Sequence, residues 1–269
     1  MIRIPFALAT LALALAASPA APQAANPVPP PGQAVPIVLP AAPQAPAAAS
    51  AAAPRLPEPA PRPTVPDITR YLNNPDLLKF STAQLAAFNG RDADILFLGD
   101  SITQGWLGKG AAVWEADFAP RNALDFGISG DQTQHVLWRM ENYPIQRLHP
   151  RVAVVLIGTN NIHNTAPEIA AGVQAILSRT QALYPGIHII LCSIMANRRA
   201  NDLMMSANAI LRTFADDKSI LYLDLVPLMT PVGDNWKGLG PDHLHPDAAG
   251  YQLWADALLP LINRLIPQS

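Results

Sequence analysis

Five short apolar runs, separated by helix-like segments, constrain the fold of this sequence more than any other feature. The runs are DILFLG (94–99), ALDFGI (123–128), RVAVVLIG (151–158), HIILCSI (188–194) and ILYLDL (220–225). Strands that are apolar throughout are covered on both faces, and strands that alternate with helices usually lie parallel. We therefore expect an α/β protein, a three-layer α/β/α sandwich with a central, mainly parallel sheet of about five strands.

The segments between and after these runs have apolar residues at helical spacing. They are TQHVLWRMEN (133–142), APEIAAGVQAILSRTQALY (166–184), NDLMMSANAILRTFA (201–215) and PDAAGYQLWADALLPLINRLI (246–266). No internal repeat interrupts the alternation. Aromatic and charged residues become frequent from Asp67 onward, so we place one domain at 67–269.

The first twenty residues have the pattern of a secretory signal peptide (1–20). Arg3 supplies an early positive charge, an apolar stretch follows, and small residues precede a cleavage position near Ala20. A membrane anchor is the alternative, but the apolar stretch is shorter than the roughly 20 residues that a spanning helix needs. We therefore expect export, to the periplasm or the medium, and no stable membrane span.

Residues 21–66 differ in composition from the rest of the chain. Together with Pro19 they hold more than half of its 29 prolines, mixed with alanine and without an aromatic residue. Such a segment cannot bury enough apolar surface to offset the entropy lost on ordering. We expect a Pro/Ala-rich disordered linker.

Charge and cysteine content narrow the classes of partner and cofactor. A formal net charge of −2 does not favour nucleic acid, so a small-molecule or polysaccharide substrate is expected. The single cysteine, Cys192, lies in an apolar run and is interpreted as a core thiol; it excludes a disulfide framework and a cysteine metal cluster. Nothing in the composition indicates the oligomeric state.

Polar segments follow four of the five predicted strands. They are GDS (99–101), SGDQT (129–133), GTNN (158–161) and PDHLHP (241–246). Ligands of open α/β sheets bind beyond the carboxyl ends of the strands, so these segments are expected to meet at one rim. Each also has a structural interpretation: Ser101 can cap a helix, and Asp242 with His245 can be a surface pair.

Serine hydrolysis would account for all of these segments together. A serine hydroxyl needs a base, the base needs an orienting partner, and the oxyanion needs fixed donors. Ser101 is the candidate nucleophile, His245 the base and Asp242 its orienting partner, with a spacing that in a helical turn places the two side chains on one side. The amides of Ser101 and Gly130 and the side chain of Asn160 are the candidate oxyanion hole.

Four further residues are candidates for substrate binding. Trp106 and Trp236 lie in polar segments near the expected site, where they would stack on a sugar or line an acyl pocket. Ile102 and Leu244 adjoin the candidate serine and histidine, and side chains facing the site would narrow it. This pattern favours short acyl groups.

These residues resemble the blocks of the SGNH hydrolases, also called GDSL esterases and lipases. Gly99 to Ser101 match the G-D-S block, Gly130 the glycine of the second block, Asn160 the G-x-N block, and Asp242 with His245 the D-x-x-H block. The run FGISGDQTQHVLWRMEN followed by GTNN is similar to the platelet-activating-factor acetylhydrolase catalytic subunits and their bacterial relatives within that family. The resemblance implies a flavodoxin-like SGNH fold, the triad and oxyanion hole given above, and no cofactor.

The sequence departs from the family pattern at two positions. Asp125 stands where the second block often has asparagine, and Asn161 where the third often has aspartate. Neither is a candidate catalytic residue, so the departures concern the supporting residues and the substrate.

The resulting functional hypothesis is a serine esterase that hydrolyses short-acyl, chiefly acetyl, esters through a covalent acyl-enzyme, with acetylated carbohydrate as one possible substrate. It would use no metal and no organic cofactor. The alternatives are a lipase or lysophospholipase for longer acyl chains, a catalytically silent envelope-binding module, and a metal-dependent hydrolase that uses His243 and His245.

Overall fold

The structure is a computed structural model that describes residues 62–88 and 91–267. The predicted signal peptide (1–20) and residues 21–61 of the predicted linker lie outside the described residues. The chain already contacts the domain before Asp67, because Pro63 is buried and its carbonyl oxygen accepts a hydrogen bond of 2.9 Å from Thr133 Oγ1.

Five parallel strands form the central sheet, as the apolar runs predict, in the order β2-β1-β3-β4-β5. Their bounds are β1 Ile95–Gly99, β2 Ala123–Gly127, β3 Val152–Leu156, β4 His188–Cys192 and β5 Ile220–Leu223. Gly99 at the end of β1 pairs with Gly127 of β2 and with Leu156 of β3. The segments that follow these three strands therefore leave the sheet at the same level, and their polar residues share one edge.

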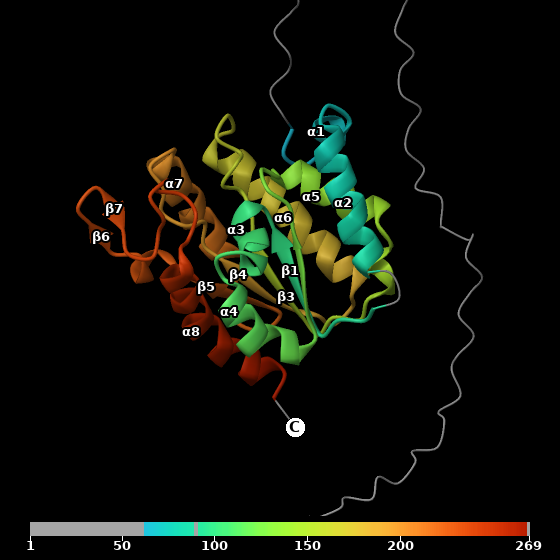
Figure 1. The fold of residues 1–269 in the computed structure, drawn as a ribbon. Helices are drawn as coiled ribbons and strands as arrows, with labels where there is room; N and C mark the ends of the chain where they lie inside the picture. The colour runs from blue at the N-terminus through green and yellow to red at the C-terminus, as the bar shows by residue number, and fades with distance from the viewer. Residues whose placement is uncertain (1–61, 89–90, 268–269) are drawn as a thin grey trace, which may run out of the picture. The chain divides into compact units, whose positions relative to one another are not determined.

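Helices cover both faces of this sheet (Figure 1), which confirms the expected three-layer α/β/α sandwich. Helices α5, α6 and α7 lie side by side on one face, and α8 packs with α3 and α4 on the other. The helices are α1 Thr69–Leu72, α2 Pro75–Phe88, α3 Ser101–Gln104, α4 Ala111–Val113, α5 Thr133–Asn142, α6 Ala166–Leu183, α7 Asn201–Leu211 and α8 Ala248–Leu265. No helix in these described ranges is both long and apolar enough to cross a membrane.

Short elements complete the chain between the long ones. They are η1 Gly105–Leu107, η2 Trp114–Phe118, η3 Ala119–Arg121, η4 Pro144–Arg147, η5 Arg212–Phe214, η6 Val226–Leu228, β6 Pro231–Val232 and β7 Asn235–Trp236. Strands β6 and β7 pair as a small antiparallel hairpin.

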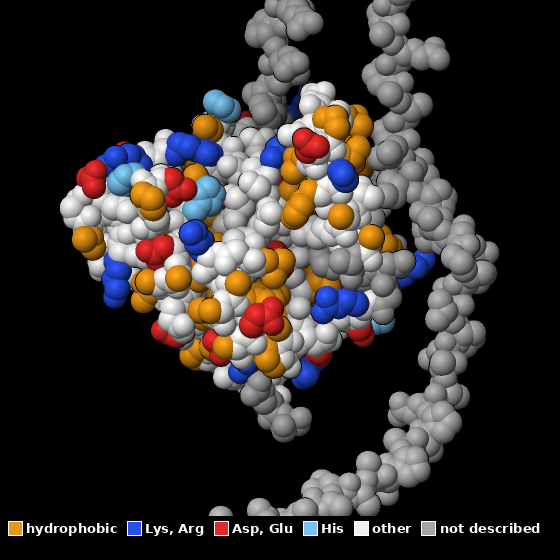
Figure 2. Space-filling view, in the orientation of Figure 1, with side chains coloured by type: hydrophobic (Ala, Val, Ile, Leu, Met, Phe, Trp, Pro, Cys, Tyr) orange, Lys and Arg blue, Asp and Glu red, His pale blue; other side chains and the backbone are white. Residues whose placement is uncertain are grey.

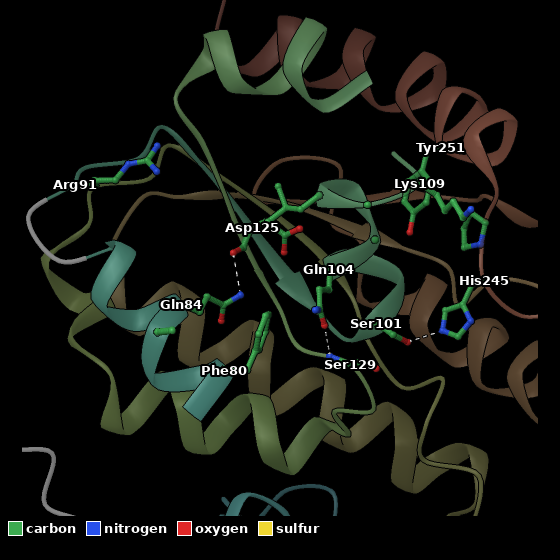
Figure 3. A pocket seen from close by; sticks show the side chains of 15 residues that line it. Phe80, Gln84, Arg91, Ser101, Gln104, Lys109, Asp125, Ser129, His245 and Tyr251 are labelled. Atoms are coloured by element: carbon green, nitrogen blue, oxygen red, sulfur yellow. Dashed lines mark hydrogen bonds between the residues drawn. The ribbon is translucent and has the colours of Figure 1, made fainter. Parts of the chain in front are cut away.

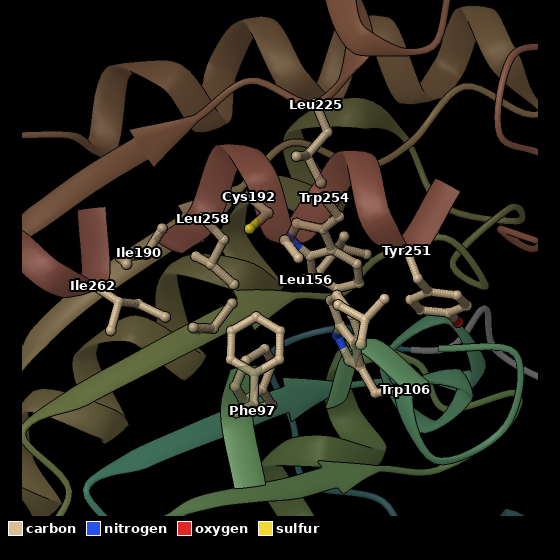
Figure 4. Close-up of a cluster of buried hydrophobic side chains, with 14 of the residues drawn as sticks. Phe97, Trp106, Leu156, Ile190, Cys192, Leu225, Tyr251, Trp254, Leu258 and Ile262 are labelled. Carbon is tan, nitrogen blue, oxygen red and sulfur yellow. The ribbon is translucent and has the colours of Figure 1, made fainter. Parts of the chain in front are cut away.

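The core beneath α8 combines aromatic rings with aliphatic side chains (Figure 4). Trp106 is fully buried between Phe97 of β1 and Trp254 of α8, with ring centroids 6.1 Å and 4.9 Å away. Cys192 is buried in the same cluster, and this burial raises the pKa of its thiol to about 12. The interpretation of Cys192 as a core thiol is confirmed.

Candidate active site

Ser101 lies at the turn between β1 and α3. The residue that caps α3 is Asp100, whose Oδ1 accepts a hydrogen bond of 2.9 Å from Ile102 N. Ser101 is the first residue of the helix, and its Oγ lies 2.8 Å from His245 Nε2. Because Asp100 performs the capping, the Ser101 hydroxyl is left to pair with the histidine.

Asp242 holds the other side of the His245 ring. His245 Nδ1 lies 2.6 Å from Asp242 Oδ2, and Asp242 Oδ1 accepts from the backbone amides of His245 at 3.0 Å and Leu244 at 3.2 Å. The segment is a turn before α8 and not the helical turn that the spacing suggested. Burial raises the pKa of Asp242, but these hydrogen bonds outweigh it and leave the pKa below its usual value. An ionised Asp242 accepts from Nδ1–H, which leaves Nε2 to accept from Ser101.

Asn160 links the loops that follow β1 and β2. Its Nδ2 donates to the backbone oxygen of Asp131 at 2.9 Å and lies 3.4 Å from Asp100 Oδ2. Its Oδ1 accepts from Arg199 Nη2 at 3.1 Å. The Asn160 amide is therefore fixed beside the segments that carry Ser101 and Gly130.

Beneath these loops lies a buried ionic network that the sequence analysis did not identify. Asp131 is fully buried and accepts from Arg139 Nε at 2.9 Å, from Arg70 Nη1 at 2.9 Å and from the Tyr71 hydroxyl at 2.6 Å. Arg139 is itself buried and donates to the carbonyl oxygen of Phe126, near the end of β2, at 2.8 Å. Two cations and a phenol thus fix a single carboxylate directly after Gly130.

Arg70 also lies against Gly130 itself. Its Nη2 donates to the carbonyl oxygen of Ser129, so the guanidinium contacts the residues on both sides of the glycine. Gly130 has a φ of +77°, and a Cβ at this position would lie 2.4 Å from Arg70 Nη2. The backbone conformation favours glycine here, and a larger residue would also displace the Arg70 guanidinium.

A cavity of about 750 Å³ opens beside Ser101 (Figure 3). Its walls come from α2, from η1 and the residues around it, and from the segment that leads into α8. The lining residues are Phe80, Ala83, Gln84, Arg91, Ser101, Gln104, Gly105, Leu107, Gly108, Lys109, Asp125, Ser129, His245, Pro246 and Tyr251. The candidate nucleophile and base therefore face a space large enough for a substrate.

Two buried carboxyl groups lie close to this cavity. Burial raises the pKa of Asp100 to about 7 and that of Asp125 to about 8. Asp125 Oδ1 accepts from Gly127 N at 2.7 Å, whereas its Oδ2 has no partner in the described part of the chain. The cavity thus holds a carboxyl group that is largely neutral at pH 7.

The predicted binding roles of Trp106 and Ile102 are wrong. Trp106 is fully buried in the aromatic core, and Ile102 is 1% exposed because α3 turns it inward, where its carbonyl oxygen accepts from the Tyr251 hydroxyl. Trp236 is half-buried on β7 and packs against the core, and neither it nor Leu244 lines the cavity. The aromatic side chains that do line it are Phe80 of α2 and Tyr251 of α8, and the sequence analysis singled out neither.

Asn161, one of the two departures from the family pattern, has a structural place. Its Oδ1 accepts a hydrogen bond of 3.1 Å from the backbone amide of Thr133, near the start of α5. It thereby joins the third polar segment to the helix that follows the second. Within residues 62–88 and 91–267 no three His, Cys, Asp or Glu side chains group so that they could hold a metal ion.

A serine and a histidine hydrogen-bonded at the carboxyl edge of a 2-1-3-4-5 parallel sheet define an SGNH-type α/β hydrolase. The profile of the GDSL-like Lipase/Acylhydrolase family matches residues 97–253, and the chain belongs to this family. It is accordingly a carboxylic ester hydrolase.

Curated relatives agree with this assignment, and solved structures share the fold. The chain is 32% identical over 190 residues to platelet-activating factor acetylhydrolase IB subunit alpha1 of Rattus norvegicus, covering 66% of this chain and 78% of the relative. A GDSL-like lipase from Bacteroides thetaiotaomicron superposes with a TM-score of 0.56 at 18% identity, over 71% of this chain and 98% of that one. A carbohydrate esterase family 3 structure from Talaromyces cellulolyticus gives 0.51 at 18% identity, over 66% and 100%.

Proposed function

We propose that the protein hydrolyses short-acyl, chiefly acetyl, esters through a covalent acyl-enzyme on Ser101. The observation that carries the proposal is the hydrogen-bond chain from Ser101 Oγ to His245 Nε2, at 2.8 Å, and from His245 Nδ1 to Asp242 Oδ2, at 2.6 Å. Both distances lie in the range of proton transfer through a general base. Acetylated carbohydrate is the proposed substrate class.

Acylation begins when Ser101 Oγ attacks the ester carbonyl carbon and His245 Nε2 takes the serine proton. The carbonyl oxygen becomes an oxyanion, which the amides of Ser101 and Gly130 and the side-chain amide of Asn160 stabilise. The C–O bond to the alcohol then breaks, and the proton on His245 passes to the departing oxygen. Asp242 stabilises the imidazolium ion that forms between these two transfers.

Deacylation repeats the steps with water as the nucleophile. His245 Nε2 removes a proton from water as the water oxygen attacks the acyl carbon, and the same donors stabilise the second oxyanion. The bond to Ser101 Oγ breaks, the proton returns to that oxygen, and the carboxylic acid leaves. The cycle uses only groups of the described chain, water and the ester.

The preference for short acyl groups rests on the acetylhydrolase relatives, since Ile102 does not narrow the site. We expect kcat/KM to be highest for acetyl or propionyl p-nitrophenyl esters and to fall steeply by octanoyl. One methylene is worth about 1 to 3 kcal/mol in a fitted pocket. A profile that rises toward octanoyl would favour the lipase or lysophospholipase alternative.

The nucleophile is tested with Ser101→Ala and a matched control, Ser129→Ala, which removes another serine hydroxyl from the same cavity. We expect the first variant to fold, to lose nearly all turnover of p-nitrophenyl acetate and to lose fluorophosphonate labelling, while the control keeps both. A Ser101→Ala protein that is still labelled by the fluorophosphonate and still turns over the ester would refute the mechanism. A wild-type protein without turnover on any ester would favour the envelope-binding module.

Export is proposed from the pattern of residues 1–20 alone. Cell fractionation of the full chain, with the mass of the recovered protein, tests it: cleavage near Ala20 and recovery outside the cytoplasm are expected. An uncleaved chain in the cytoplasm would refute it.

A further inference from the structure

The cavity beside Ser101 extends from His245, past the nucleophile, to Phe80, Gln84 and Asp125 (Figure 3). His245 and Pro246 line it, whereas the oxyanion donors Gly130 and Asn160 do not. In the proposed cycle the departing alcohol oxygen must take its proton from His245 Nε2. The cavity that His245 lines is therefore assigned to the alcohol.

Apolar side chains form the mouth of the cavity. Phe80 of α2 is 43% exposed and Leu107 of η1 is 55% exposed, and both belong to the lining. Figure 2 shows orange side chains on the surface of the molecule in the region of α2. An aromatic ring left open to solvent at the entrance of a catalytic cavity offers a flat surface on which a ligand can stack.

Deeper in the cavity lie polar atoms without partners. Asp125 is 4% exposed, and its Oδ2 accepts and donates no hydrogen bond within the described residues. Gln84 Oε1 is in the same state, although Gln84 Nε2 donates to the carbonyl oxygen of Gly127 at 3.0 Å. An unpaired buried polar group is unfavourable, so a ligand hydroxyl that bonded to these oxygens would be bound more tightly.

We infer that this cavity is a sugar subsite, in which the ring of an acetylated carbohydrate stacks on Phe80 and its hydroxyl groups bond to Asp125 and Gln84. The inference rests on the proposed esterase function. A pyranose presents an apolar C–H face and several hydroxyls at once, which matches an exposed aromatic ring followed by unpaired oxygens. An alkyl alcohol would match the ring and leave the oxygens unpaired.

The protonation state of Asp125 fits a hydroxyl partner. Because burial raises its pKa to about 8, the carboxyl is mostly neutral at pH 7 and offers both a donor and an acceptor. A sugar hydroxyl also donates and accepts, so one hydroxyl can either donate a hydrogen bond to this carboxyl group or accept one from it.

The test compares two acetyl esters that differ only in the alcohol. Acetylated xylobiose fills the subsite, whereas the ethyl group of ethyl acetate is too small to reach Phe80. For Phe80→Ala, Gln84→Met and Asp125→Leu we expect the ratio of kcat/KM for acetylated xylobiose over ethyl acetate to fall about tenfold. Lys79→Ala, an exposed neighbour of Phe80 that does not line the cavity, is the matched control and should leave the ratio unchanged.

Two outcomes would overturn the sugar subsite. One is an unchanged ratio in all three cavity variants. The other is an equal loss with decyl acetate, which would assign the cavity to an alkyl alcohol. Binding of unacetylated xylobiose, followed by calorimetry in wild-type and Phe80→Ala protein, measures the subsite without catalysis; weaker binding in the variant is expected, and no binding to the wild-type would count against the subsite. A wild-type protein that binds xylobiose but cleaves no ester would refute the esterase proposal alone.

Discussion

Replacing Arg70 with methionine should slow catalysis although Arg70 is not expected to touch the substrate. The guanidinium donates to Ser129 O and to Asp131 Oδ1, on both sides of Gly130. The backbone oxygen of Asp131 in turn accepts from Asn160 Nδ2 at 2.9 Å. Arg70→Met keeps the aliphatic stem and removes these donors, so two of the three candidate oxyanion donors lose part of their support.

The size of the effect follows from what remains around Asp131. Arg139 and Tyr71 still contact its carboxylate, and the Arg70 side chain is 29% exposed, so we expect a loss of only about 1 to 2 kcal/mol in unfolding free energy. Catalysis is more sensitive, because a displacement of about 1 Å at a reacting centre can cost as much as 10²-fold. We expect kcat to fall about 10- to 10²-fold with KM changed less than about threefold. Arg70→Lys keeps the positive charge but not the two parallel donors of the guanidinium, so its kcat should lie between those of Arg70→Met and the wild-type protein.

Steady-state kinetics with p-nitrophenyl acetate give kcat and KM, and urea unfolding with an unchanged m-value gives the stability. A role in positioning is indicated by a lower kcat at a nearly unchanged KM. General destabilisation would instead lower the fraction of folded enzyme, which the unfolding curve would show. A folded Arg70→Met protein with kcat within about twofold of wild-type would refute the reasoning.

Three further predictions use the same assays. Asn160→Ala should lower kcat on the order of 10²- to 10³-fold with little change in urea midpoint, and a small effect would remove Asn160 from the oxyanion hole. Because burial raises the pKa of Asp125 to about 8, the folded state keeps a proton that the unfolded state releases above about pH 4. The unfolding free energy of the wild-type protein should therefore fall between pH 5 and 8 relative to that of Asp125→Asn. Parallel plots of unfolding free energy against pH for the two proteins would contradict the raised pKa. Trp106→Ala should cost about 3 to 5 kcal/mol of stability, and a change confined to KM would restore its predicted binding role.

The sheet and the long helices could be predicted from the sequence because their signals are local. Each strand is a continuous apolar run, and β1, β2 and β3 are buried at every position. Helices α1 and α2 are not among the predicted elements, although both lie within the predicted domain that begins near Asp67. The β6–β7 hairpin was not predicted either, because two-residue strands have no periodicity to detect.

The candidate site divides in the same way. Ser101, His245 and Asp242 could be named because the first directly follows a strand and the other two lie in a polar segment shortly before a helix, where parallel topology brings chain segments together. The burial of Trp106 could not be predicted, because its polar neighbours in sequence do not show that η1 folds beneath Tyr251 and Trp254. Arg70 could not be found either, since its partner Asp131 lies 61 positions away and no local pattern links them.

The hydrogen bond between Ser101 and His245 joins residues 144 positions apart. Ester turnover therefore reports on the whole topology at once: a chain that has formed β1 to β4 but not yet docked α8 has a nucleophile and no base. Contacts of such long range form late and slowly during folding. Recovery of activity after dilution from urea should consequently lag behind recovery of helical circular dichroism, and this esterase can serve as its own sensor of the last step of folding.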